Sequence, residues 1–262
     1  MKNYLSLCIM SKNENEYLKE NIQYHIKLGV DHFYIYDNGS DMPLKEDLAD
    51  FKNVTVIDWD DSKISSHCRA FDDCLNKFNT MSRWIGFIDT DEFIVLNKQN
   101  SLKEFLKEYE SYAGLGINWK CFGSSGHLEK QHSVIDSYTY AKDINDNIHI
   151  KSIVQCKWVK QTGGNPHCFI YKPGKFCVDE KKNRIPGPHN KNISYSEIQL
   201  NHYVTRSRAD FLEKRMRGGG NDRSNKKLTE QFWNRFQGGV EDLNIHKLLQ
   251  RLNENSTRNY NI

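Results

Sequence analysis

The sequence has no Cys-x-x-Cys pair, although it contains seven cysteines among its 262 residues. Zinc sites and redox motifs use cysteines at that spacing, so neither kind of site is predicted. The cysteines are odd in number and scattered along the chain, which favours a reducing compartment over a disulfide framework. We therefore expect a cytoplasmic protein.

Long apolar runs and strong net charge are also missing. No run approaches the roughly 20 residues of a membrane-spanning helix, and the apolar stretch at 4–10 is too short for a secretory signal with its cleavage site. Lys and Arg number 37 against 34 Asp and Glu, a formal net charge of +3. This near balance argues against nucleic acid as the main partner.

The composition is that of a folded enzyme-sized domain. Hydrophobic residues make up 37% of the chain and aromatic residues 12%, which is enough to bury a substantial core. There is no internal repeat and no low-complexity linker. We expect one large domain, or one domain with an appendage.

The first hundred residues alternate between strand and helix patterns. Strands are expected at 4–10, 32–36, 54–57 and 84–88. One helix follows the first of these strands, and another, from about 63 to 78, follows the third. Gly29 stands where a left-handed helix cap is expected. This order predicts an α/β fold with a doubly wound, mostly parallel sheet, in which ligands bind at the carboxyl ends of the strands.

Two acidic clusters fall at those carboxyl ends. Asp37 follows the second strand, and Asp89-Thr90-Asp91 follows the apolar strand that begins at Trp84. Two hard oxygen ligands a short distance apart suit Mg²⁺ or Mn²⁺ bridging a diphosphate. The plain alternative is an acidic loop that caps the next helix.

The pattern is less regular after residue 117. Strands are expected at 148–156 and 167–171, and an amphipathic helix with a frayed tail closes the chain. We expect a domain over 1–240, with a nucleotide-sugar-binding half at 1–116 and an acceptor-side half at 117–240, followed by the helix and tail at 241–262. That helix packs on the domain by default; the alternatives are a second subunit or a membrane.

The segment Trp84-Ile85-Gly86-Phe87-Ile88-Asp89-Thr90-Asp91-Glu92-Phe93 resembles glycosyltransferases with the GT-A fold, in particular family 92 (the DUF23 group) and related family-2-like bacterial enzymes. The resemblance spans about 7–218 and continues, in order, through 12–14, 24–25, 28–41, 122–127, 151–154 and 200–203. Each stretch is weakly specific alone, but their order is highly specific. The resemblance implies a Rossmann-like GT-A domain.

The resemblance also implies a metal site for Mn²⁺ or Mg²⁺. Asp91 is the expected direct ligand. Asp89 is expected to hold the ribose or a metal-bound water, and it is also a second candidate ligand. His202 in Leu-Asn-His-Tyr is the third. An isolated histidine is more often structural than a ligand, and that alternative stays open for His202.

The donor nucleotide sugar is expected to contact residues at the strand ends and on basic segments. These are Asn13, Glu14, Asp37, Asn38, Asp89, Thr90, Lys151 and Arg217. Eight basic residues against three acidic ones lie between 206 and 227, and Arg217 with the glycines at 218–220 is expected to form a cationic loop over the diphosphate. The alternatives are helix capping for Asn13 and Glu14, turn formation for Asp37, an exposed strand lysine at Lys151 and a solvated helix face.

The resemblance implies inversion, which requires a general base near the acceptor hydroxyl. The candidates are His127 and Glu129, beyond a Gly-Ser-Ser-Gly turn, or Asp179 and Glu180. A structural role is the more common alternative for each.

We therefore expect a metal-dependent, inverting transferase that moves a hexose from a UDP-sugar to an oligosaccharide or lipid-linked glycan in surface glycan assembly. It would act in the cytoplasm, with peripheral contact at the inner face of the membrane and no nucleic-acid partner. One rival is a nucleotidyltransferase, although the segment 11–15 lacks its Gly-rich loop; another is a non-catalytic carbohydrate-binding module. The donor sugar, linkage and oligomeric state are not encoded in any motif.

Overall fold

The computed structural model describes residues 2–61, 63, 65–217 and 228–258. Its first half alternates strands and helices as the sequence predicts. In chain order these are β1 (Asn3–Ser11), α1 (Asn15–Lys27), β2 (His32–Asp37), α2 (Leu44–Asp47), β3 (Val54–Asp58), α3 (Ser66–Phe78) and β4 (Ser82–Phe87). The cap expected at Gly29 is confirmed by a φ of 100° directly after α1, which a residue with a Cβ rarely adopts.

The second half is built mainly from short strands. Its elements are β5 (Glu92–Leu96), α4 (Leu102–Lys107), β6 (Gly114–Phe122), α5 (Val134–Ser137), β7 (Tyr140–Lys142), the 3₁₀ turn η1 (Asn145–Ile148), β8 (Ile150–Gln155), β9 (Val159–Thr162), β10 (Phe169–Tyr171), β11 (Cys177–Val178), β12 (Arg184–Ile185), β13 (Ile198–His202), α6 (Arg208–Arg217), α7 (Glu230–Arg235), β14 (Val240–Glu241) and α8 (Asn244–Arg258). The strands expected at 148–156 and 167–171 are thus confirmed in shorter form.

The sheet runs in the order β12-β11-β6-β8-β4-β1-β2-β3. Strands β4, β1, β2 and β3 are parallel, and every antiparallel pair among the described residues includes a strand from the second half. The expected α/β fold with a large, mostly parallel sheet is confirmed.

Strand β6 joins the two parts of the sheet. Its first half pairs with β8 and β11, while its second half pairs with β13 and β7. A Cβ at Gly116 would lie 2.7 Å from Ile185 Cδ1 and 2.8 Å from Ile150 Cδ1, so a side chain here would have to displace these two isoleucine side chains. Strand β13 pairs with β6 on one side and with β5 on the other, so that it lies next to the acidic segment.

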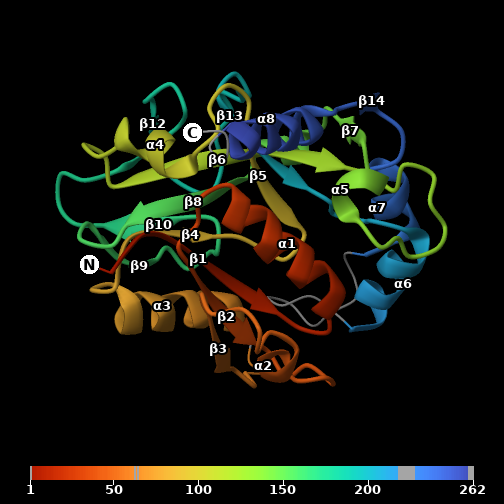
Figure 1. The fold of residues 1–262 in the computed structure, drawn as a ribbon, viewed down its shortest axis with the longest axis horizontal. Helices are drawn as coiled ribbons and strands as arrows, with labels where there is room; N and C mark the ends of the chain where they lie inside the picture. The colour runs from red at the N-terminus through yellow and green to blue at the C-terminus, as the bar shows by residue number, and fades with distance from the viewer. Residues whose placement is uncertain (1, 62, 64, 218–227, 259–262) are drawn as a thin grey trace.

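Helices cover both faces of the sheet (Figure 1). One face carries α1, α4 and α8, whose buried residues join the main hydrophobic core with strand residues such as Leu7 and Ile94. The other face carries α3 and the β9–β10 pair, where Phe71, Phe87 and Phe169 pack together. On α3 the side chains of Ala70, Phe71, Cys74 and Leu75 are buried, and Phe78 packs partly buried beside them. Both faces of the sheet are therefore packed.

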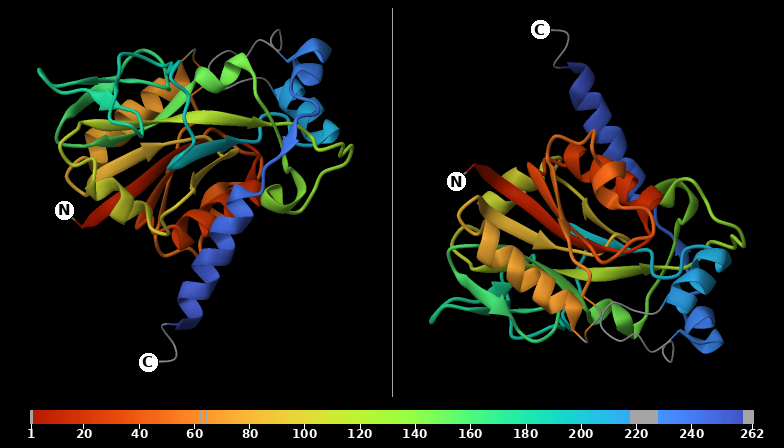
Figure 2. Two further views of the ribbon diagram at one scale, coloured as in Figure 1. Left: turned by 90° about the horizontal axis from the view of Figure 1, so that it is seen from above. Right: turned by 90° about the horizontal axis from the view of Figure 1, so that it is seen from below.

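Strand β14 and the first half of α8 pack against the rest of the domain. The domain boundary expected after residue 240 falls inside β14, which pairs with β7, and Leu248 of α8 is 0% exposed in the main core. The expected tail from residue 253 is helical as far as Arg258; residues 259–262 lie outside the described part. Figure 2 shows the C-terminal half of α8 projecting from the body.

Two absences hold for the described residues. No helix there is long and apolar enough to cross a membrane. The seven cysteines, all within the described ranges, are free thiols, and six of them are buried.

Candidate active site

The carboxyl ends of four parallel strands meet at one edge of the sheet. Ser11 of β1 stands opposite Asp37 of β2, and Asp37 stands opposite Asp58 of β3. On the other side of β1, Cys8 is paired with Phe87 at the end of β4. The chain then continues through Ile88 to Asp89. The edge that topology favours for ligands thus holds the acidic residues singled out from the sequence.

The acidic segment is a tight turn between β4 and β5. The amide of Asp89 donates to Glu92 Oε2 at 2.8 Å, and the amide of Glu92 donates to Asp89 O at 3.1 Å. Asn21 of α1 donates its side-chain amide to the backbone oxygens of Thr90 and Glu92, at 3.1 and 2.8 Å. The buried side of α1 therefore fixes the backbone of the turn, and contact of the Thr90 side chain with the donor stays a prediction.

Lys151 of β8 neutralises the first aspartate. Its Nζ lies 2.8 Å from Asp89 Oδ1 and 3.7 Å from Glu92 Oε2, and its side chain is 1% exposed. Burial acts to raise the pKa of Asp89, but Lys151 and then His67, whose Nε2 is 3.2 Å away, hold that pKa well below its usual range. Burial holds the pKa of Glu92 well above its usual range. Lys151 is therefore a buried partner of Asp89, which rules out the exposed-lysine alternative, and its contact with the donor stays a prediction.

Asp91 faces a different set of partners. Strand β13 pairs antiparallel with β5 and sets His202 opposite Glu92, so that His202 Nε2 lies 3.7 Å from Asp91 Oδ1. Lys214 of α6 donates to Asp91 Oδ2 at 2.8 Å. Burial raises the pKa of Asp91, but Lys214 and His202 lower it, to about 2. Asp91 is thus an ionised carboxylate shared between an imidazole and an ammonium group.

The imidazole of His202 is neutral and faces Asp91 through Nε2. Burial lowers its pKa to about 4, against the opposing effect of Asp91, so the ring is neutral near pH 7. Its Nδ1 is buried without a hydrogen-bond partner, an unusual state for a buried polar atom.

Glu14, after β1, binds two arginines. Arg206 pairs with it at 2.6 and 2.9 Å, and Arg217 of α6 at 2.5 Å. Arg217 also donates to Lys12 O at 2.7 Å. Burial raises the pKa of Glu14, but the two arginines bring it below its ordinary value. The sequence-predicted Glu14 and Arg217 are thus brought together; the glycines at 218–220 lie outside the described residues.

Asn13, Asp37 and Asn38 shape the loops at this edge. Asp37 accepts hydrogen bonds from the amides of Ser40 and Leu44, both at 2.9 Å. Asn13 donates its side-chain amide to Asp41 Oδ2, and its Oδ1 accepts from the backbone amide of Asp41. In the amide orientation that satisfies its neighbours, Asn38 donates to the backbone oxygens of Trp59 and Asp61. The turn-forming alternative therefore accounts for the hydrogen bonds of Asp37, and contact of these three residues with a nucleotide stays a prediction.

His127 and Glu129 lie in the segment that packs against the start of α6. The backbone oxygen of His127 accepts from the amide of Arg208 at 3.1 Å, and His127 Nε2 is 3.1 Å from Ser137 O. Glu129 is exposed. Neither is joined to Asp89 or Asp91 by a described contact, and their role as base stays a prediction.

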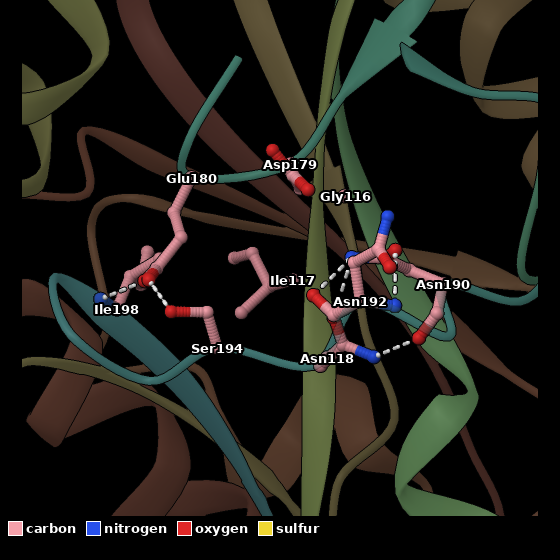
Figure 3. A pocket seen from close by; sticks show the side chains of 9 residues that line it. All are labelled: Gly116, Ile117, Asn118, Asp179, Glu180, Asn190, Asn192, Ser194 and Ile198. Carbon is pink, nitrogen blue, oxygen red and sulfur yellow. Dashed lines mark hydrogen bonds between the residues drawn. The ribbon is translucent and has the colours of Figure 1, made fainter. Parts of the chain in front are cut away.

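Asp179 and Glu180 line a small pocket beside β6 (Figure 3). Glu180 accepts hydrogen bonds from Ser194, Ser196, Glu197 and Ile198. Burial opposes these donors, yet the pKa of Glu180 falls below its ordinary value.

Asp179 accepts hydrogen bonds from the amides of Lys181 and Asn183 in the turn between β11 and β12. The structure thus gives both carboxylates a loop-building role, and neither is joined to the acidic turn by a described contact.

Three site residues were not predicted individually. Lys214 and Arg206 belong to the basic excess between 206 and 227, which was the available signal for them. His67 sits in the first turn of α3, where nothing in its neighbours indicates a contact with Asp89. Such contacts join positions more than 20 residues apart, so local patterns cannot report them.

A divalent cation fits the pair formed by Asp91 and His202. Among the described residues no three His, Cys, Asp or Glu side chains converge as a metal site. However, Mg²⁺ in nucleotide sites commonly takes one or two protein ligands plus phosphate oxygens, with bonds of about 2.1 Å. The 3.7 Å between Asp91 Oδ1 and His202 Nε2 is within the reach of one bridging ion. An ionised carboxylate and a neutral imidazole are the forms that metal binding requires.

Residues 3–237 match the sequence model of Glycosyltransferase family 92. A glycosyltransferase family 92 protein of Ricinus communis is 32% identical over 198 residues, which cover 71% of this chain and 35% of that protein. A family 92 protein of Arabidopsis thaliana is 33% identical, over 66% of this chain and 32% of its own length. The chain thus spans about a third of the length of these relatives.

A solved structure, S. aureus TarS residues 1–349 in complex with UDP, is 18% identical. Its alignment covers 88% of this chain and 71% of that chain, with a TM-score of 0.41.

Proposed function

The chain belongs to glycosyltransferase family 92, and from this premise we propose that it transfers a hexose from a nucleoside-diphosphate sugar, with UDP as the nucleotide, to a carbohydrate acceptor. The single observation that carries the proposal is the arrangement of Asp91, His202 and Lys214 at the carboxyl edge of the sheet. That edge is where open α/β sheets bind ligands.

Asp91 and His202 would hold Mn²⁺ or Mg²⁺ at this edge. When bound, the cation would offset the negative charge that grows on the departing nucleoside diphosphate. Lys214 and Arg217 stand on the same side of α6, three residues apart, with their charged groups at the acidic turn and at the loop after β1. They are placed to bind diphosphate oxygens as well.

Asp89 would serve the donor in a different way. Lys151 and His67 fix its carboxylate, which suits a hydrogen bond to the ribose or to a metal-bound water better than direct metal binding. Transfer with inversion needs a base on the acceptor side, and His127, Glu129, Asp179 and Glu180 stay the candidates for it. Of these, Asp179 and Glu180 would have to give up loop hydrogen bonds.

We infer that the acceptor is an oligosaccharide or lipid-linked glycan of a cell-surface polymer, reached from the cytoplasm at the inner face of the membrane. Leu212 and Met216 of α6, one helical turn apart, are 39% and 75% exposed beside Arg215. Apolar side chains next to basic ones support peripheral contact with a membrane. No observation favours a nucleotidyltransferase or a non-catalytic module over this proposal.

Donor hydrolysis tests the proposed function. With Mn²⁺ present, one member of a panel of nucleotide sugars should slowly release nucleoside diphosphate, and Asp91→Asn should reduce that rate by roughly a hundredfold or more. The matched control is the exposed Asp50→Asn, which should retain the wild-type rate. No hydrolysis of any donor, together with no metal-dependent nucleotide binding, would refute the proposal.

A further inference from the structure

The candidate site pairs its acidic side chains with basic side chains of its own. Four acidic side chains, Glu14, Asp89, Asp91 and Glu92, are each within 4 Å of a basic group, and the four basic residues involved are Lys151, Arg206, Lys214 and Arg217. A nucleoside diphosphate would therefore bring negative charge to a site whose cations are already engaged.

The cations differ in how firmly they are held. Lys151 is 1% exposed and Arg206 is 4% exposed, and each is surrounded by protein. Lys214 is 26% exposed and is held by two contacts, Asp91 Oδ2 at 2.8 Å and the backbone oxygen of Val204 at 3.3 Å. A long, flexible side chain with a partly solvated ammonium group can exchange partners at low cost.

We propose that Lys214 is the exchangeable counter-ion of Asp91: it occupies this carboxylate in the donor-free protein and moves to the diphosphate when a divalent cation takes Asp91. This inference rests on the proposed function, which places a metal and a nucleotide at this edge. It assigns Lys214 two partners in turn, a carboxylate and then a phosphate oxygen.

Exchange of this kind couples metal binding to nucleotide binding. A cation that arrives alone must separate Lys214 from Asp91 and leave the ammonium group without an anion. A cation that arrives with a nucleotide provides the diphosphate as a new partner for Lys214. The metal should therefore bind more tightly when UDP is present, and UDP should bind more tightly when the metal is present, by the same factor.

The experiment measures Mn²⁺ binding by electron paramagnetic resonance, with and without saturating UDP, and UDP binding by calorimetry. The wild type should bind Mn²⁺ at least about fivefold more tightly with UDP than without it. Lys214→Met should bind Mn²⁺ alone roughly tenfold more tightly than wild type, bind UDP more weakly, and lose most of the coupling. Lys214→Arg should keep the coupling.

The matched control is Arg215→Met. Arg215 is the next residue of α6 and pairs with Glu230 at 3.7 Å, so this variant removes one positive charge from the helix without touching Asp91. It should behave as wild type. Thermal melts of all variants verify folding, and Lys214→Gln replaces Lys214→Met if the latter does not fold.

Two results would overturn the inference. One is an unchanged affinity of Lys214→Met for Mn²⁺ alone. The other is a gain in Mn²⁺ affinity that is equal with and without UDP, because simple relief of charge repulsion would produce it. If the wild type binds neither Mn²⁺ nor UDP, the proposed function itself fails, so the two failures are distinguishable.

Discussion

At the scale of single residues, the acidic turn depends on polar side chains buried in α1. His25 Nδ1 donates to Asn21 O at 2.9 Å, and His25 Nε2 accepts from the amide of Ile94 at 3.2 Å. Asn21 in turn holds the backbone of Thr90 and Glu92. These hydrogen bonds lead from His25 through Asn21 to the acidic turn. The protonation state of His25 is therefore connected to the geometry of the site.

His25 should make the stability of the protein pH-dependent. Burial lowers its pKa from 6.5 to about 3, so between these values the unfolded state binds one proton more than the folded state. This contribution to stability is complete above pH 6.5 and is lost as the pH falls towards 3, by about 1.4 kcal/mol per pH unit. Urea unfolding from pH 4.5 to 6.5 measures the slope.

His25→Gln should reduce that slope by about one proton, whatever its effect on stability at neutral pH. The exposed His132→Gln is the control and should keep the wild-type slope. An identical slope in His25→Gln would contradict the account of a buried, neutral imidazole.

At the scale of elements, β4 positions the acidic turn that follows it, and the neighbouring strands β1 and β8 pack closely against β4. A Cβ at Gly86 would lie 2.6 Å from Leu7 Cδ2 of β1 and 3.4 Å from Ile153 Cγ1 of β8. Gly86→Ala should overpack this contact and lower the free energy of unfolding by about 1–3 kcal/mol, measured by urea denaturation.

Gly187→Ala is the matched control for Gly86→Ala. A Cβ at Gly187 meets no atom within 4 Å, and its φ lies outside the left-handed region. We expect a change of at most about 0.5 kcal/mol there. Equal effects of the two substitutions would show that β4 is less tightly packed than described.

The sequence predicts the elements of the parallel half well because its signals are local. The apolar run before Asp89 and the turn residues after Asp37 indicate both the strands and the edge at which their ends meet. The partners of Asp91 are different: β13 reaches β5 through pairings made across a hundred residues, and Lys214 comes from a helix beyond it. Periodicity identifies a basic helix there but cannot say which carboxylate its lysine meets.

At the scale of the whole molecule, α8 and the sheet form one packed body. The amphipathic pattern at the end of the chain was compatible with packing, a partner subunit or a membrane, and the structure shows packing: Arg251 donates to Leu96 O at 2.7 Å, and Leu248 is buried in the core. The pattern alone could not distinguish these three alternatives, because a helix presents the same apolar stripe to a domain, a subunit or a membrane.

Leu248→Ala should therefore destabilise the entire protein, by about 2–5 kcal/mol in a single cooperative unfolding transition. Leu243→Ala, at a side chain that is 38% exposed, should change stability by at most about 0.5 kcal/mol. A separate early transition in Leu248→Ala, with the remaining protein unaffected, would indicate that α8 is an independent appendage.

The central claim is that Asp91 and His202 bind the cation that holds the diphosphate of the donor. Its most direct test is a crystal structure grown with Mn²⁺ and UDP, with anomalous diffraction to locate the metal. We predict a manganese peak within bonding distance of a carboxylate oxygen of Asp91 and of a ring nitrogen of His202, bridged to the diphosphate, with Lys214 turned from Asp91 to a phosphate oxygen. A nucleotide bound elsewhere, or a metal that touches neither residue, would contradict the account.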